Sequence, residues 1–156
     1  MSRRLPAAAA VFAAALFIGV TALLADWSPG GTVVCGNAED QYENSSIMDG
    51  EGNLITAWFD NRSGYGDIYA QKIDPGGNAL WAADGVPVCT APDDQQDQAI
   101  VTDGEGGAIL VWEDERTGIN TLFAQRLDPS GNTLWSAGGD SVSGMSDYVY
   151  GFDAVG

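Results

Sequence analysis

The chain repeats itself after 54 positions. When residues 41–88 are aligned with residues 95–142, 21 of the 48 pairs are identical. The identities gather in three blocks, which read Asp-Gly-Glu-Gly, Trp-x-Asp-x-Arg-x-Gly and Asp-Pro-x-Gly-Asn-x-Leu-Trp. Self-similarity at a fixed period indicates a duplicated structural unit whose copies stack on one another. The repeat therefore predicts an architecture, and it does not name a ligand.

Turn signals divide each unit into short strands. Residues 49–53 and 103–107 are glycine-rich reversals, which favour hairpin turns. The Asp-Pro-x-Gly-Asn blocks predict a second turn in each unit, because proline presets φ and glycine adopts a positive φ there. We expect strands at 44–48, 54–59, 67–73 and 80–81 in the first unit, and at 98–102, 108–112, 121–127 and 134–135 in the second.

The strand that follows each Asp-Gly turn is apolar at consecutive positions, which predicts burial on both faces and an inward Trp58 and Trp112. Four short antiparallel strands covered in this way are typical of one blade of a β-propeller. An immunoglobulin sandwich needs about 100 residues, and a leucine-rich or β-helix repeat is much shorter. The predicted fold is all-β, with two to three four-stranded antiparallel blades of a partial β-propeller, preceded by an N-terminal signal helix.

The three repeated blocks carry a resemblance to a known group of proteins. They resemble the tandem repeats of secreted bacterial proteins of the sialidase-like and kelch-like propeller group, over about residues 27–156. The resemblance implies a propeller fold and says little about function. The turn at Asp74–Trp81 resembles the Asp-box of sialidases in turn type only, because that motif places its Trp closer to the Asp.

The first 25 residues differ in composition from the rest of the chain. Arg3 and Arg4 precede an apolar, alanine-rich run from Leu5 to Ala25. This layout is typical of a secretory signal peptide cleaved after Ala22 or Ala25. An uncleaved membrane anchor is the alternative, because about 20 apolar residues can span a bilayer. Either way we expect a protein that is secreted or held in the cell envelope.

The repeat register predicts how the chain is divided. We expect a signal peptide or anchor at 1–25, a partial first repeat at 26–40, blades at 41–94 and 95–143, and the start of a truncated third repeat at 144–156. Closure of a propeller takes four to eight blades. We therefore expect the chain to continue into further repeats or to self-associate.

The charge balance excludes some classes of partner. All 22 acidic residues lie beyond the leader, where four basic residues remain, so this part carries a net charge of 4 − 22 = −18. Such a surface repels phosphate backbones and anionic lipids, which argues against nucleic acid or a membrane surface as partner. Binding of divalent cations, a saline habitat and simple solubility all remain open. The remaining partner classes are a protein or a carbohydrate.

Two cysteines in an exported chain suggest a disulfide. However, Cys35 and Cys89 occupy equivalent positions of neighbouring units, and the third equivalent is Ser143. Equivalent atoms of stacked sheets are about 10 Å apart, whereas a disulfide needs Cα atoms within about 7 Å. We therefore expect two free, partly buried thiols.

The Trp-x-Asp-x-Arg-x-Gly block is the place where a charge pair and an aromatic residue recur together. Arg62 and Arg116 could line a face that binds carboxylates, because guanidinium presents a bidentate fork to anions. Alternatively, pairing of Asp60 with Arg62, and of Asp114 with Arg116, locks the loop between the second and third strands. A residue that recurs in every unit favours the structural interpretation.

A calcium site is the second hypothesis for these loops. Residues 60–67 offer oxygen ligands in a glycine-containing loop, but Arg62 stands where a ligand is needed, and Asp67 becomes Thr121 in the second unit. The hairpin turns could also bind a cation through Asp49, Glu51, Asp103 and Glu105, although Asp-Gly reversals form without one.

Catalysis has little support in the sequence. The chain contains no histidine, which excludes histidine-dependent triads and imidazole metal sites. We assign no catalytic, cofactor-binding or metal-binding residue, and no cofactor. The expected function is a non-enzymatic binding or scaffolding surface, in a fragment of a longer protein. The alternative is the N-terminal part of a propeller glycoside hydrolase of the sialidase-like kind, whose catalytic residues lie outside this chain.

Overall fold

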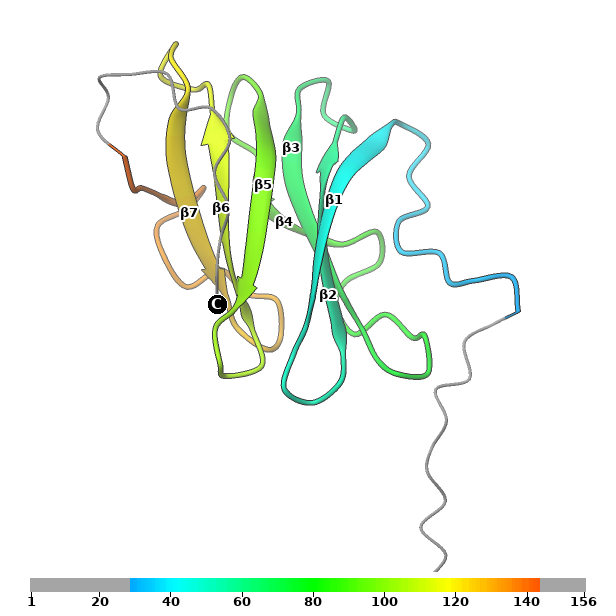
Figure 1. The fold of residues 1–156 in the computed structure, drawn as a ribbon. Helices are drawn as coiled ribbons and strands as arrows, with labels where there is room; N and C mark the ends of the chain where they lie inside the picture. Colours follow the sequence, from blue (N-terminus) through cyan, green and yellow to red (C-terminus); the bar gives the residue numbers. More distant parts are fainter. Residues whose placement is uncertain (1–28, 144–156) are drawn as a thin grey trace, which may run out of the picture.

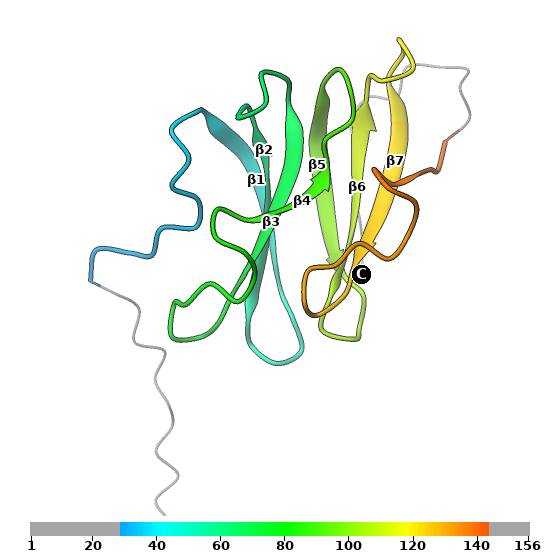
Figure 2. The ribbon, with the colours of Figure 1, turned by 180° about the vertical axis from the view of Figure 1, so that it is seen from behind.

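The computed structural model describes residues 29–143, which form two four-stranded antiparallel sheets lying side by side (Figures 1 and 2). The first sheet consists of β1 (Gln41–Met48), β2 (Leu54–Asp60), β3 (Asp67–Ile73) and β4 (Val86–Cys89). The second consists of β5 (Gln95–Thr102), β6 (Ala108–Asp114), β7 (Thr121–Leu127) and β8 (Asp140–Ser141). The expected signal helix and the expected start of a third repeat lie outside the described residues.

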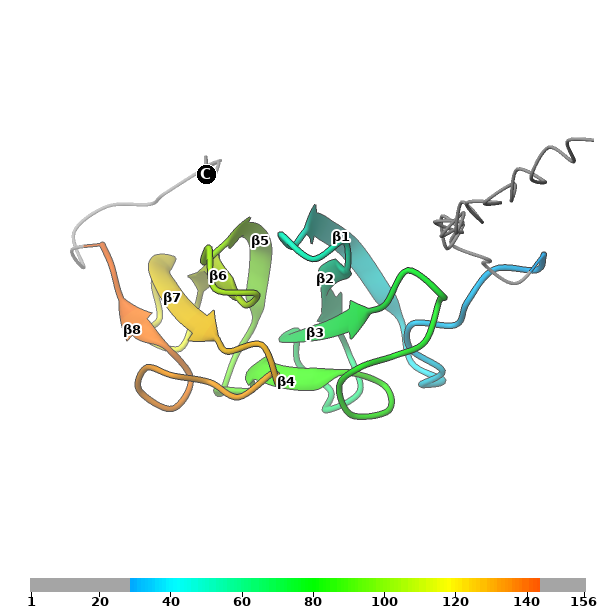
Figure 3. The ribbon, with the colours of Figure 1, turned by 90° about the horizontal axis from the view of Figure 1, so that it is seen from below.

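Each sheet is a meander whose strands pair in chain order. Seen from below, both sheets run from their first strand at one side to their fourth strand at the other (Figure 3). The all-β class and the second and third strands of each unit are confirmed. Within residues 29–143 no helix has the length and apolar character needed to cross a bilayer.

The predicted fourth strands are wrong. Leu80-Trp81 and Leu134-Trp135 lie in the loops after β3 and β7, where a single bridge joins Ile73 to Ala79 in the first unit. The fourth strands come later, as β4 and the two-residue β8, and pair with β3 and β7. In the first unit, the side chain of Gln71 and the carbonyl of Pro129 hold Trp81 of this pair in its loop.

The first strand of each unit begins three residues earlier than predicted, at Gln41 and Gln95. A β-bulge interrupts each of these strands, because the pairing register shifts between Tyr42 and Ser45 and again at the equivalent place in β5. The bulges contain Glu43 and Asp97, whose φ angles are 55° and 53°. A non-glycine residue in this left-handed region is uncommon, and its recurrence makes the bulge a feature of the unit.

The core lies between the two sheets. One cluster of buried side chains includes Ile55 and Ala57 of β2 together with Leu110 and Trp112 of β6. Side chains alternate along a strand, so the first sheet uses its Ile55 face and the second sheet uses its Trp112 face. Lys72, the β3 partner of Ile55, crosses the same interface and donates to the carbonyl of Gly106 at 2.8 Å. Two equivalent units therefore meet through two different faces.

Candidate functional site

In the first unit, the Trp-x-Asp-x-Arg-x-Gly block forms a polar network around the buried carboxylate of Asp60. Trp58 Nε1 donates to Oδ2 at 2.8 Å, and Arg62 Nε donates to Oδ1 at 2.8 Å. Arg62 Nη2 forms an ion pair with Oδ2 at 2.6 Å, and the Arg62 backbone N–H donates to Oδ1 at 3.0 Å. Both carboxylate oxygens are therefore fully engaged.

The second unit builds the same network around Asp114. Trp112 Nε1 donates to Oδ2 at 2.9 Å, while Arg116 Nε donates to Oδ1 at 2.7 Å and Nη2 pairs with Oδ2 at 2.5 Å. The predicted pairing of Asp and Arg within each loop is thus confirmed twice. The Trp rings that close the networks are buried, as predicted.

The guanidinium groups use their remaining contacts inside the fold. Arg62 Nη2 donates to the carbonyl of Asp84 at 2.8 Å, and its guanidinium carbon lies 3.7 Å from the centre of the Tyr69 ring. Arg116 makes the equivalent contacts with the carbonyl of Gly138 and the ring of Phe123. In each unit the arginine therefore connects the loop between the second and third strands to the loop before the fourth strand. This is a structural role.

Charge stabilises this lock. Burial alone would raise the pKa of Asp60, but hydrogen bonds from Arg62 and Trp58 outweigh it and hold the pKa below its usual value. The pKa of Arg62 is raised above its usual value, chiefly by the hydrogen bond with Asp60. Both groups consequently stay charged near neutral pH, and removal of either one leaves a buried charge without its partner.

The hairpin turns are closed by their own aspartates. Asp49 Oδ1 accepts the backbone N–H groups of Glu51 and Asn53, and Oδ2 pairs with Lys72 Nζ at 2.8 Å. Burial opposes ionisation of Asp49, but the bonds from Lys72 and Asn53 outweigh it and hold the pKa well below its usual range. The turn is therefore a side-chain-capped reversal completed by a lysine, rather than a loop that needs a cation.

Asp103 closes the second hairpin in the same manner. Its Oδ1 accepts from the N–H groups of Glu105 and Gly107, and Oδ2 pairs with Arg126 at 2.9 Å. Across residues 29–143, no group of three or more Asp, Glu or Cys side chains has the arrangement of a metal site. In the 60–67 loop, Asp60 is taken by Arg62, and one carboxylate oxygen of the buried Asp67 has no hydrogen-bond partner.

Both cysteines are free, as predicted. Their sulfurs accept from the locking arginines, at 3.3 Å between Arg62 Nη2 and Cys35 Sγ and at 2.9 Å between Arg116 Nη2 and Cys89 Sγ. Cys89 belongs to the first sheet and Arg116 to the second, so this contact joins neighbouring units. Cys35 stands before β1 and makes the same contact with the first sheet from outside.

Two residues that the sequence interpretation did not single out position the Leu-Trp loop. The side chain of the buried Gln71 accepts from the N–H of Trp81 at 3.0 Å and donates to the carbonyl of Ala82 at 2.7 Å. Gln125 repeats both contacts with Trp135 and Ser136. The signal was present, because the Ala-Gln pair is identical in both units.

Trp81 contacts the next unit. Its Nε1 donates to the carbonyl of Pro129 at 3.0 Å, and its ring lies where a side chain on Gly131 would have to stand. The tryptophan of the first unit therefore packs on the Asp-Pro-x-Gly-Asn turn of the second unit. This contact explains the buried tryptophan of the Leu-Trp pair, whereas Leu80 beside it is exposed.

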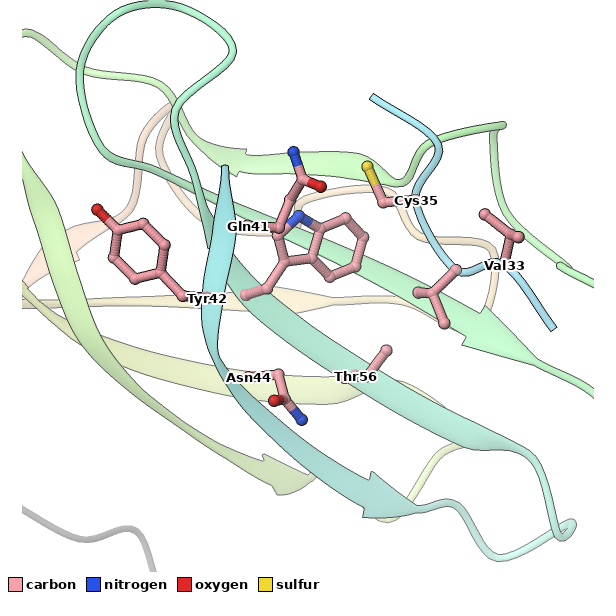
Figure 4. A pocket seen from close by; sticks show the side chains of 8 residues that line it. Val33, Cys35, Gln41, Tyr42, Asn44 and Thr56 are labelled. Carbon is pink, nitrogen blue, oxygen red and sulfur yellow. The ribbon is translucent and has the colours of Figure 1, made fainter. Parts of the chain in front are cut away.

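An open pocket of about 280 Å³ lies on the face of the first sheet that points away from the second (Figure 4). Val33 and Cys35 come from the segment before β1, Asn44 comes from β1, and Thr56 comes from β2. Trp58 also lines the pocket, and most of the lining surface is apolar. The pocket thus combines an aliphatic and aromatic wall with a polar amide.

The same positions of the second unit explain the origin of this pocket. Asn44 and Thr56 are equivalent to Gln98 and Leu110, which are buried between the two sheets. Gln98 Nε2 there donates to the backbone carbonyl of Glu43 in the first sheet. The pocket is therefore the half of an inter-unit interface that no neighbouring sheet covers among residues 29–143.

Comparison with known proteins adds no relative to this picture. The chain matches no protein-family model, no curated protein and no solved structure. The repeated networks and the open face of the first sheet are consequently the features on which an assignment of function rests.

Proposed function

We propose that the chain is an exported β-propeller repeat module, each sheet being one blade, that acts as a non-enzymatic binding or scaffolding surface. The observation that supports this proposal is the open pocket at Asn44, an exposed residue whose counterpart Gln98 is buried under a neighbouring sheet. A face built for contact and left uncovered is a ready binding surface. The leader supports a location outside the cell or in its envelope.

The chemistry of the face limits the partner. Aromatic and aliphatic walls with an amide at the rim suit a protein surface or a carbohydrate. The excess of acidic residues disfavours nucleic acid and anionic lipid. The recurring Asp–Arg pairs are used to lock loops, so they offer no free acid and nucleophile for hydrolysis of a glycosidic bond.

Site-specific photo-crosslinking in producing cells tests the proposal. A photoreactive amino acid at position 44, on the open face, is compared with the same group at position 51, an exposed turn residue. We expect a covalent adduct at position 44 that is absent at position 51. Equal labelling at both positions, or release of fluorophore from fluorogenic glycosides by the purified protein, would contradict a non-enzymatic binding surface.

A further inference from the structure

We propose that the chain assembles head to tail, so that the outer face of the second sheet of one copy covers the open pocket on the first sheet of another. The proposal rests on the scaffolding function proposed above and names a second copy of the chain as its partner. It starts from the interface inside the chain, where two equivalent units meet through different faces.

Each unit carries both of these faces. The first sheet uses its Ile55 face inside the chain and leaves its Trp58 face outside. The second sheet uses its Trp112 face and leaves outside the face with Ile109 and Val111, two apolar side chains that are only half-buried. An interface between two different faces of one unit is heterologous, so it can be repeated between copies until a ring closes or a fibre grows.

Trp135 is much more exposed than its equivalent Trp81, which packs on a neighbouring unit. Trp81, which sits on the turn of the next unit, is 8% exposed, whereas its equivalent Trp135 is 39% exposed. The neighbouring leucines Leu80 and Leu134 are exposed to 50% and 49%, so the difference is confined to the tryptophan. In the proposed assembly Trp135 sits on the turn at residues 74–78 of a second copy, which is equivalent to the seat of Trp81.

One polar contact of the internal interface has a counterpart in the proposed assembly, whereas the place equivalent to that of Cys89, beside Arg62, is already taken by Cys35 of the same chain. Gln98 donates its side-chain N–H to the carbonyl of Glu43, which the bulge in β1 turns toward the second sheet. Asn44 is the equivalent of Gln98, and Asp97 has the same bulge conformation as Glu43. In the proposed assembly Asn44 of one copy faces the carbonyl of Asp97 in another, with a side chain one methylene shorter than that of Gln98.

Charge makes a separate prediction for this assembly. The part of the chain beyond the leader carries a net charge of 4 − 22 = −18, so copies repel one another at low ionic strength. The proposed contacts are apolar or involve backbone carbonyls, so salt screens the repulsion without removing the attraction. Association should therefore strengthen as salt concentration rises.

Light scattering on four forms of the full chain tests the proposal. Asn44→Arg places a charge in the pocket, Trp135→Ala removes the anchor on the opposite face, and Leu134→Ala is the matched control. Loss of a central tryptophan contact should weaken association by more than about tenfold. The leader is common to all four forms, so it cannot produce differences among them.

We expect the wild type and Leu134→Ala to assemble, and Asn44→Arg and Trp135→Ala each to be monomeric. A 1:1 mixture of the two monomeric variants should form a species of twice the monomer mass, because each retains the face that the other has lost. A wild type that stays monomeric at high salt, a Trp135→Ala form that assembles normally, or a mixture that stays monomeric would each overturn the proposal. If the wild type is monomeric but still forms covalent adducts with other molecules at position 44, self-assembly is ruled out. The proposed binding function is then still supported.

Discussion

At the scale of single residues, Asp67 is a place where the two units differ. It is buried, and one of its carboxylate oxygens has no hydrogen-bond partner, whereas the equivalent Thr121 bonds to Thr117 and to the carbonyl of Ile119. Burial raises the pKa of Asp67 above its usual value and outweighs the hydrogen bond from Ser63. At this position the first unit therefore has a buried ionisable carboxyl group, whereas the second unit has a hydroxyl group.

Replacement of Asp67 by Asn should raise the free energy of unfolding at pH 7 by about 1 to 3 kcal/mol, because a neutral amide replaces a carboxylate whose charge is unfavourable at this buried position. Because the pKa of Asp67 is higher in the folded than in the unfolded state, ionisation at pH values above 3.8 destabilises the fold. Below pH 3.8 the carboxyl is protonated in both states, so the stabilisation by Asn should disappear there. Urea unfolding at pH 7 and pH 3 measures both. An equal gain from Asp140→Asn, at an exposed position, would show that the effect is general charge reduction.

Cys35 and Cys89 should differ in reactivity although they are equivalent in sequence. Burial raises the pKa of Cys89 to about 11, and its side chain is enclosed between the sheets, whereas Cys35 is partly exposed. Because the thiolate is the nucleophile, we expect iodoacetamide at pH 8 to modify Cys35 first in the folded protein. Mass spectrometry of peptides after timed labelling checks the order, and equal rates in the native state would contradict it.

At the scale of elements, the loop before each fourth strand is held by a close approach between glycine and tryptophan. A Cβ on Gly85 would lie 2.5 Å from the Trp58 ring and 2.9 Å from the Ala70 carbonyl oxygen. Gly118 has a similar φ of +81° and open space around it. Gly85 is therefore required by packing as well as by backbone conformation, whereas Gly118 is required by conformation alone.

Gly118→Ala should cost about 1 to 2 kcal/mol of unfolding free energy, the usual cost of a left-handed conformation. Gly85→Ala should cost at least about 2 kcal/mol more, because the tryptophan ring and its bond to Asp60 have to move. Thermal unfolding of the two variants side by side measures the difference. Equal losses would mean that the ring does not pack against this loop.

The sequence predicted those elements whose signals are local. The hairpin turns and the Asp–Arg pairs lie in the repeated blocks, and the second and third strands are runs of apolar and β-forming residues between turn signals. The fourth strands were not predicted, because Val86–Cys89 contains a proline and shares one residue with its counterpart in the second unit. The Leu-Trp pair has the apolar character of a strand, but its Trp81 contacts the next unit, and local periodicity does not record such a contact.

At the scale of the whole molecule, the leader predicts export. We expect the mature protein to begin near Leu23 or Asp26, after a cleavage site of small residues. Mass spectrometry of protein recovered from the culture medium and from the envelope fraction identifies the first residue. An intact Met1 on membrane-bound protein would favour an anchor over a cleaved signal peptide.

The open pocket could not be predicted from the sequence, because it depends on how the two units are stacked. Thr56 is polar where Leu110 is apolar, but a single polar residue does not predict which face of the sheet lacks a neighbour. Asn44 is exposed, whereas its equivalent Gln98 is buried against a neighbouring sheet. The position of a unit within the stack determines whether its residues are covered, and a local sequence pattern does not contain that information.

The two units dock through Trp81, which packs on the Asp-Pro-x-Gly-Asn turn of the second unit. This docking is tested most directly by unfolding of Trp81→Ala and Trp135→Ala, both combined with Asn44→Arg so that the chain is monomeric. Trp81→Ala should lose about 3 to 5 kcal/mol of unfolding free energy, as expected for a buried tryptophan, and Trp135→Ala should lose less than about 1 kcal/mol. Equal losses for the two variants would contradict docking of the first unit on the second.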